Sequence, residues 1–164
     1  MFQLPIPNFD AEHSKGSAEL GQLPDWNLND LYTSTDAKEL VNDLNWLEKE
    51  CDEFAKNYEG KLKFLSADEM LKCVIRNEKI SSISGRIISY AGLLYYQKTT
   101  DADRAKFLSD MQEKITIFTT KLVFFSLEIN SLDDDFLESL FKENVKLSRY
   151  KPVFEKIRAL KPYQ

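Results

Sequence analysis

Histidine is almost absent from this sequence, which contains a single one, His13, among 164 residues. A hydrolytic zinc site of the H-E-x-x-H type needs two histidines one helical turn apart, with a glutamate between them. Sites built from four cysteines, or from two cysteines and two histidines, need more ligands than the two cysteines and one histidine present. We therefore assign no catalytic residue and no metal ligand, and we expect no cofactor in this chain.

Cysteine is also scarce, and both Cys51 and Cys73 stand among apolar residues at helical spacing. This pattern favours two buried thiols in a reducing compartment over a disulfide or a redox pair. No basic region followed by an apolar run opens the sequence, which argues against a signal peptide. The longest apolar runs, Leu93–Tyr96 and Leu122–Phe125, fall far short of the roughly 18 residues that span a bilayer. We predict a cytoplasmic protein without a membrane partner.

Excess positive charge is missing too, since the net charge is −5 and the pI about 5.0. The counterion release that drives nucleic-acid binding has little to act on, so we expect no nucleic-acid partner. A local basic cluster occurs near the end of the chain. We interpret it as a solvated helix face in preference to an anion site. Its members are Arg149, Lys151, Lys156, Arg158 and Lys161.

Glycine and proline number only five each, which favours long helices over many short strands. Residues 1–24 contain three of the prolines and show no period, so we predict an extended or partly disordered arm there. From Thr35 an amphipathic helix is predicted over about 36–58. Its stripe consists of Leu40, Val41, Leu44, Leu47, Cys51, Phe54, Ala55 and Tyr58.

Further helices follow at short intervals. Ser66-Ala-Asp-Glu69 is a capping-box sequence and predicts a helix that runs to about Gln97. Another helix is predicted over about 102–129, with Ala105, Leu108, Met111, Gln112, Ile115, Phe118, Leu122, Phe125 and Ile129 on its buried side.

Two shorter helices are predicted near the end of the chain. Asp133–Asp135 begin one that ends near Lys142, because acidic residues suit a first turn. The same run could offer oxygen ligands to magnesium or calcium, but it lacks the glycine and the spaced ligands of an EF-hand. Pro152 suits the first turn of a second short helix over about 151–160.

The predicted fold is all-α, an antiparallel bundle of three long helices and two shorter ones with an irregular N-terminal arm. We divide the chain into the arm at 1–24 and one helical domain at 25–164. Tyr90, Tyr95 and Tyr96 form an aromatic patch near the end of the second helix. We weigh two interpretations of this patch, contact with a peptide or another domain and ordinary core packing.

Four segments in order resemble oligoendopeptidase F and related zinc peptidases of the thimet oligopeptidase-like family. They span about residues 23–164 with matching gaps. They are Leu23–Tyr32; Ser89–Tyr95 with Thr99–Asp101 and Ala105–Phe107; Phe124–Asn130; and Leu147–Tyr150 with Lys161–Tyr163. The resemblance implies a cytoplasmic zinc endopeptidase that cleaves short peptides in a channel between two helical halves. The zinc ligands and the catalytic glutamate of that family lie in its C-terminal half, so no position here matches them.

We therefore expect a non-catalytic N-terminal portion, a wall of the substrate channel that is inactive alone. Its expected partners are the C-terminal catalytic portion, covalently joined or split, and short peptides in the full protein, with zinc bound there. Such a chain would be an expressed fragment, a truncated reading frame or one piece of a split gene. Exposed apolar surface also predicts self-association. The alternative is a stand-alone helical protein–protein interaction module.

Overall fold

The computed structural model describes residues 26–159, and these are all-α, as predicted. The predicted arm at 1–24 lies outside the described residues. Within the described range no helix combines the length and the apolar character needed to cross a bilayer. The elements are α2 (Lys38–Tyr58), the 3-10 helix η2 (Leu62–Phe64), α3 (Ala67–Gln97), α4 (Ala102–Thr120), α5 (Val123–Ser131), α6 (Asp134–Glu143), α7 (Val145–Ser148) and α8 (Lys151–Arg158).

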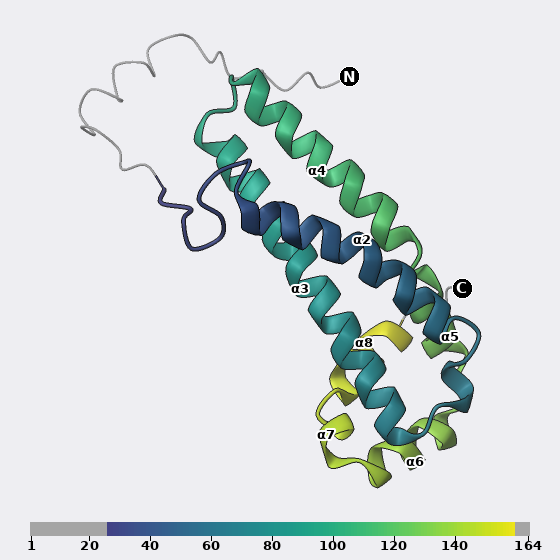
Figure 1. Cartoon of the computed structure of the whole chain (residues 1–164). Helices are drawn as coiled ribbons and strands as arrows, with labels where there is room; N and C mark the ends of the chain where they lie inside the picture. Colours follow the sequence, from purple (N-terminus) through teal and green to yellow (C-terminus); the bar gives the residue numbers. More distant parts are fainter. Residues whose placement is uncertain (1–25, 160–164) are drawn as a thin grey trace, which may run out of the picture.

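The three long helices α2, α3 and α4 pack together, and the short helices gather at one end of this bundle (Figure 1). Two ion pairs fix the direction of α2 against α3. The Nε of Arg76 lies 2.7 Å from Oε1 of Glu50, and Arg86 pairs with Asp43 further along. Later residues of α3 thus meet earlier residues of α2, so the two helices are antiparallel, as predicted.

Helix α3 begins at the predicted capping box. The Glu69 backbone N–H donates to Ser66 Oγ at 3.4 Å, and the Ser66 N–H donates to Glu69 Oε2 at 2.9 Å. Two N–H groups that the helix cannot satisfy internally gain acceptors in this way. The predicted end at Gln97 is also confirmed.

The single helix predicted over 102–129 is wrong, because α4 ends at Thr120 and α5 begins at Val123. The apolar residues continue through the break, so periodicity alone gives no sign of it. The hydroxyls of Thr116, Thr119 and Thr120 each donate to the carbonyl four residues earlier. Such bonds compete with the regular helical bonds and favour bends and ends.

The count of two shorter helices is also wrong. Besides α6 and α8, the described residues contain α5 and α7 as separate short helices, and η2 between α2 and α3. Asn144 separates α7 from α6, since its Oδ1 accepts from the N–H groups of Lys146 at 2.9 Å and Leu147 at 3.0 Å. Asn is a favoured N-cap because its short side chain reaches these donors.

The apolar stripes are only partly as predicted. In α2 the core residues are Leu40, Leu47, Cys51 and Phe54, whereas Val41 is 46% exposed. In α4 Met111 and Ile115 are buried, but Ala105 and Gln112 are exposed. Helix α4 is an outer helix that contacts α2 and α3 with one face, so its buried stripe is narrower than the sequence pattern suggested.

Candidate functional site

The structure separates the three tyrosines that the sequence grouped. Tyr90 is 3% exposed and belongs to the core. Its ring packs edge-on against Tyr32, with centroids 5.4 Å apart, and against Phe107 of α4 at 6.1 Å. Burial raises the pKa of Tyr90. Tyr90 thus joins α3 to α4 and to the segment before α2.

Tyr96 lies at the surface and is 63% exposed, while Tyr95 is partly buried. Their ring centroids are 5.5 Å apart. Six residues separate Tyr90 from Tyr96, which places them about 120° apart around the helix. Of the three side chains, only Tyr96 offers most of its surface to another molecule.

Tyr96 lines a groove between α3 and α4 with a volume of about 340 Å³, which we call the α3–α4 groove. None of its lining side chains carries a charge. A Cβ added at Gly92 would meet only Tyr96 Cε2, at 3.7 Å, so there is room for a side chain at that position. The groove can bind apolar groups and contains no acid–base pair. Its lining residues are Ile88, Ser89, Gly92, Leu93, Tyr96, Leu108 and Gln112.

A second hollow, of about 450 Å³, is polar and lies where the segment before α2 meets the start of α4. Its ionic groups hold the fold. The Asp101 carboxylate accepts from the N–H groups of Asp103 and Arg104, which lowers its pKa. Arg104 Nη1 donates to the Leu94 carbonyl at 2.9 Å. Asp101 thus caps α4, and Arg104 ties it to the end of α3.

Tyr32 anchors the segment before α2, and it belongs to the first of the four resembling segments. Its hydroxyl donates to Asp43 Oδ2 at 2.6 Å and accepts from Arg86 Nε at 2.9 Å. Burial, and then the hydrogen bond to Asp43, raise its pKa to about 12. The resembling motif therefore contributes a buried structural contact here.

The two thiols are buried and free, as predicted. Burial raises the pKa of Cys51 to about 11 and that of Cys73 to about 12. A nucleophilic cysteine requires the opposite shift, because the thiolate is the reactive form. Within residues 26–159 no group of three or more His, Cys, Asp or Glu side chains could hold a metal ion. His13 lies outside the described residues.

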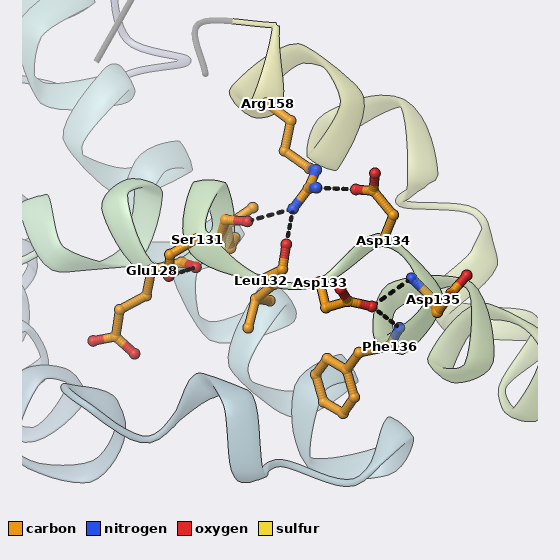
Figure 2. A network of polar contacts seen from close by, with 9 residues as sticks. Glu128, Ser131, Leu132, Asp133, Asp134, Asp135, Phe136 and Arg158 are labelled. Carbon is orange, nitrogen blue, oxygen red and sulfur yellow. Dashed lines mark hydrogen bonds and ion pairs between the residues drawn. The ribbon is translucent and has the colours of Figure 1, made fainter. Parts of the chain in front are cut away.

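The acidic run at 133–135 is a helix start, the interpretation that the sequence favoured. Asp133 Oδ1 accepts from the N–H groups of Asp135 at 2.9 Å and Phe136 at 3.3 Å (Figure 2). The neighbouring Asp134 pairs with Arg158 of α8. The Asp133 carboxylate thus caps the start of α6, and the Asp134 carboxylate links α6 to α8.

Arg158 is the centre of this polar network, with its guanidinium between α5, α6 and α8 (Figure 2). Its Nη1 donates to the carbonyls of Ile129 at 2.9 Å and Leu132 at 2.8 Å, while Nη2 bonds Asp134. Its side chain is only 13% exposed. Carbonyls at the end of a helix have few donors within the helix. The Ile129 carbonyl accepts from the Leu132 N–H at 3.3 Å, and Arg158 supplies it with a second donor and the Leu132 carbonyl with one.

The rest of the predicted basic cluster does not form one site. Lys151 donates to Glu138 of α6 at 2.6 Å, next to a T-shaped contact between Phe141 and Phe154. Two of the cluster's cations therefore fasten α8 to α6. Lys161 lies outside the described residues.

Glu128 of α5 organises the turn between α2 and η2, a role that the sequence did not reveal. Its carboxylate accepts from the N–H of Gly60 at 2.6 Å and of Leu62 at 3.2 Å. Gly60 has φ = 75°, a left-handed conformation that glycine adopts without steric cost. The acceptor of the Gly60 N–H lies 68 residues away in the sequence, so no local residue pattern indicates this contact.

Comparison with known protein families gives a match over the last part of the chain. Residues 128–164 match the model of the peptidase M3 N-terminal family, described as oligopeptidase F. Searches of curated proteins and of solved structures found no significant match. The matched segment begins at Glu128 and contains Arg158 together with the whole fourth resembling segment. The resemblance to the N-terminal portion of oligoendopeptidase F, predicted from the motifs, is thereby confirmed over residues 128–164, while the first two resembling segments lie outside the match.

Proposed function

We propose that this chain is the non-catalytic N-terminal segment of an oligoendopeptidase F-like zinc endopeptidase that cleaves short peptides in the cytoplasm. The observation that carries the proposal is the family match at 128–164. The zinc, its ligands and the catalytic glutamate would be supplied by the catalytic portion, and this chain would form one wall of the substrate channel.

The α3–α4 groove is the surface that we assign to contact with the catalytic portion. Three of its residues, Ser89, Gly92 and Leu93, come from the second resembling segment. The groove is uncharged and open beside an exposed aromatic ring, which suits an apolar anchor from another domain. The capping and clamping contacts of Glu128 and Arg158 would keep this wall rigid.

Binding to a catalytic portion tests this assignment. The partner is an oligoendopeptidase F-like enzyme expressed without its own N-terminal segment, and calorimetry measures the affinity. Gly92→Leu fills the groove and should weaken binding about tenfold or more, while improving helix propensity. Gly85→Leu is the matched control on the same helix, because a Cβ there meets nothing within 4 Å.

Three outcomes of this binding experiment would count against the assignment. Unchanged affinity for Gly92→Leu would show that the groove is not the contact. Equal weakening by both leucine variants would point to a general effect of altering α3. A chain that binds no catalytic portion, yet retains an unrelated protein at stoichiometric yield, would favour the stand-alone interaction module.

A further inference from the structure

A second groove lies on the other side of α4, between α2 and α4, with a volume of about 430 Å³. Two of its apolar side chains are well exposed, Val41 at 46% and Ile117 at 56%. Val41 and Ile117 share this groove with the partly buried Leu44 and Phe118, and a contiguous exposed apolar patch of this kind is a candidate interface. We call it the α2–α4 groove, and its lining residues are Val41, Leu44, Asn45, Glu48, Lys114, Ile117 and Phe118.

The α2–α4 groove also presents one charge of each sign, on opposite walls. Glu48 stands on α2 and Lys114 on α4, and both are exposed. Neither forms a salt bridge or a hydrogen bond with its side chain anywhere in residues 26–159. The α3–α4 groove has no charged lining, so this arrangement is particular to the α2 side.

The register of the two helices places Glu48 and Lys114 within about one helical turn of each other along the helix axes. Helices α2 and α4 run parallel, and Asp52 pairs with Lys121 near their C-terminal ends. Glu48 precedes Asp52 by about one turn, and Lys114 precedes Lys121 by about two turns. The carboxylate and the ammonium are therefore offset by about one turn along a common axis, on different helices.

We propose that the α2–α4 groove is the interface of a homodimer. A twofold axis parallel to the helices places α2 of one copy opposite α4 of the other, because a twofold interface pairs each patch with itself. Glu48 then faces Lys114 of the second copy, and this pairing occurs twice. The same interface covers Ile117, about one turn after Lys114, and Val41, about two turns before Glu48, of both copies. This proposal does not depend on the proposed peptidase role.

Charge reversal with rescue tests the interface, using sedimentation velocity of the whole chain over a range of concentrations. The unaltered protein should dimerise. Lys114→Glu replaces two attractions with two repulsions and should raise the dimer Kd about tenfold or more. Combining it with Glu48→Lys restores opposite charges across the interface and should return the Kd to within about threefold.

Lys114→Glu is the cleaner single variant. The pKa of Lys121 is raised by its hydrogen bond to Asp52 and, to a lesser degree, by the charge of Glu48. Reversing Glu48 alone therefore also affects a neighbouring ion pair. Circular dichroism of each variant checks that the helices are retained.

A second pair of variants tests the contribution of the apolar side chains to the dimer interface. Ile117→Ser removes exposed apolar surface from the groove and should weaken the dimer, whereas Ile75→Ser removes a similar surface, 46% exposed, on α3. Ile75 does not line the α2–α4 groove, so its variant should dimerise normally. A monomer at all concentrations, failure of the folded double reversal to restore the dimer, or equal weakening by both serine variants would overturn the proposal.

Discussion

Replacing Arg158 by methionine removes the guanidinium that joins α5, α6 and α8 while keeping much of the apolar stem. Three bonds are lost, two to the carbonyls of Ile129 and Leu132 and one to Asp134. The carbonyl bonds lie in a part-buried setting, whereas the Asp134 side chain is 83% exposed. The three bonds should therefore contribute unequally to stability.

The free energy of unfolding should fall by about 3 kcal/mol in Arg158→Met. Each hydrogen bond from a charged donor contributes about 1.5–3 kcal/mol, and water would replace part of the loss at the freed carbonyls. The exposed pair with Asp134 contributes less than about 1 kcal/mol, so Asp134→Asn should cost no more than that. Arg158→Lys keeps the charge but not the planar guanidinium, so its loss of unfolding free energy should lie between those of Asp134→Asn and Arg158→Met.

Urea unfolding followed by circular dichroism at 222 nm measures these differences, provided that the slope with denaturant is unchanged. The order of cost should be Arg158→Met, then Arg158→Lys, then Asp134→Asn. If Asp134→Asn costs as much as Arg158→Met, the ion pair holds α8 and the carbonyl bonds do not. If Arg158→Met is neutral, the network does not stabilise the fold.

Three other changes follow from the structure. Glu128→Ala should lower the free energy of unfolding by about 2 kcal/mol in urea melts, because it leaves two N–H groups in the turn at 60–62 without their acceptor. Ser66→Ala should cost about 1 kcal/mol in the same assay, through loss of the α3 cap; Ser82→Ala, an exposed site within α3, is its control and should be nearly neutral. The thiols Cys51 and Cys73 should react with a disulfide reagent at pH 8 only as fast as the protein opens. Rapid labelling of the native protein would contradict the burial of the thiols. Folding raises the pKa of Cys51 to about 11 and that of Cys73 to about 12. The contribution of these thiols to the free energy of unfolding is therefore complete below the thiol pKa of the unfolded chain, near 9, and is lost as the pH rises above that value.

Features that depend on neighbouring residues could be predicted from the sequence. The capping box at Ser66 and Glu69 and the end of α3 were predicted correctly, because a helix start needs donors and acceptors only three residues apart. The acidic start of α6 and the proline in the first turn of α8 are equally local. All-α architecture followed from these signals and from the scarcity of glycine and proline.

The break after Thr120 could not be predicted in the same way. The residues Leu122 and Phe125 continue the apolar spacing of α4, so the hydrophobic pattern predicts one helix. Threonine hydroxyls bonded back to carbonyls favour an end of α4 at this point, but threonine occurs inside many helices without such an effect. Val41 was misplaced for a related reason, since a periodic stripe does not show how wide a face the neighbouring helices cover.

The polar network lay beyond sequence reasoning because its acceptors are backbone atoms. The carbonyls that Arg158 caps are 29 and 26 residues earlier in the chain, and main-chain groups leave no residue pattern. The separation of Tyr90 from Tyr96 could have been foreseen, because a spacing of six residues places two side chains on different faces of a helix. The sequence identified the aromatic patch, and helical geometry divides it between core and surface.

Cleavage of a quenched fluorescent peptide tests the central claim most directly. This chain, with zinc added, should give no turnover alone, and it should raise the activity of an oligoendopeptidase F-like catalytic portion that lacks its own N-terminal segment. Turnover that follows the purified chain through every column, or a catalytic portion indifferent to its presence, would contradict the account.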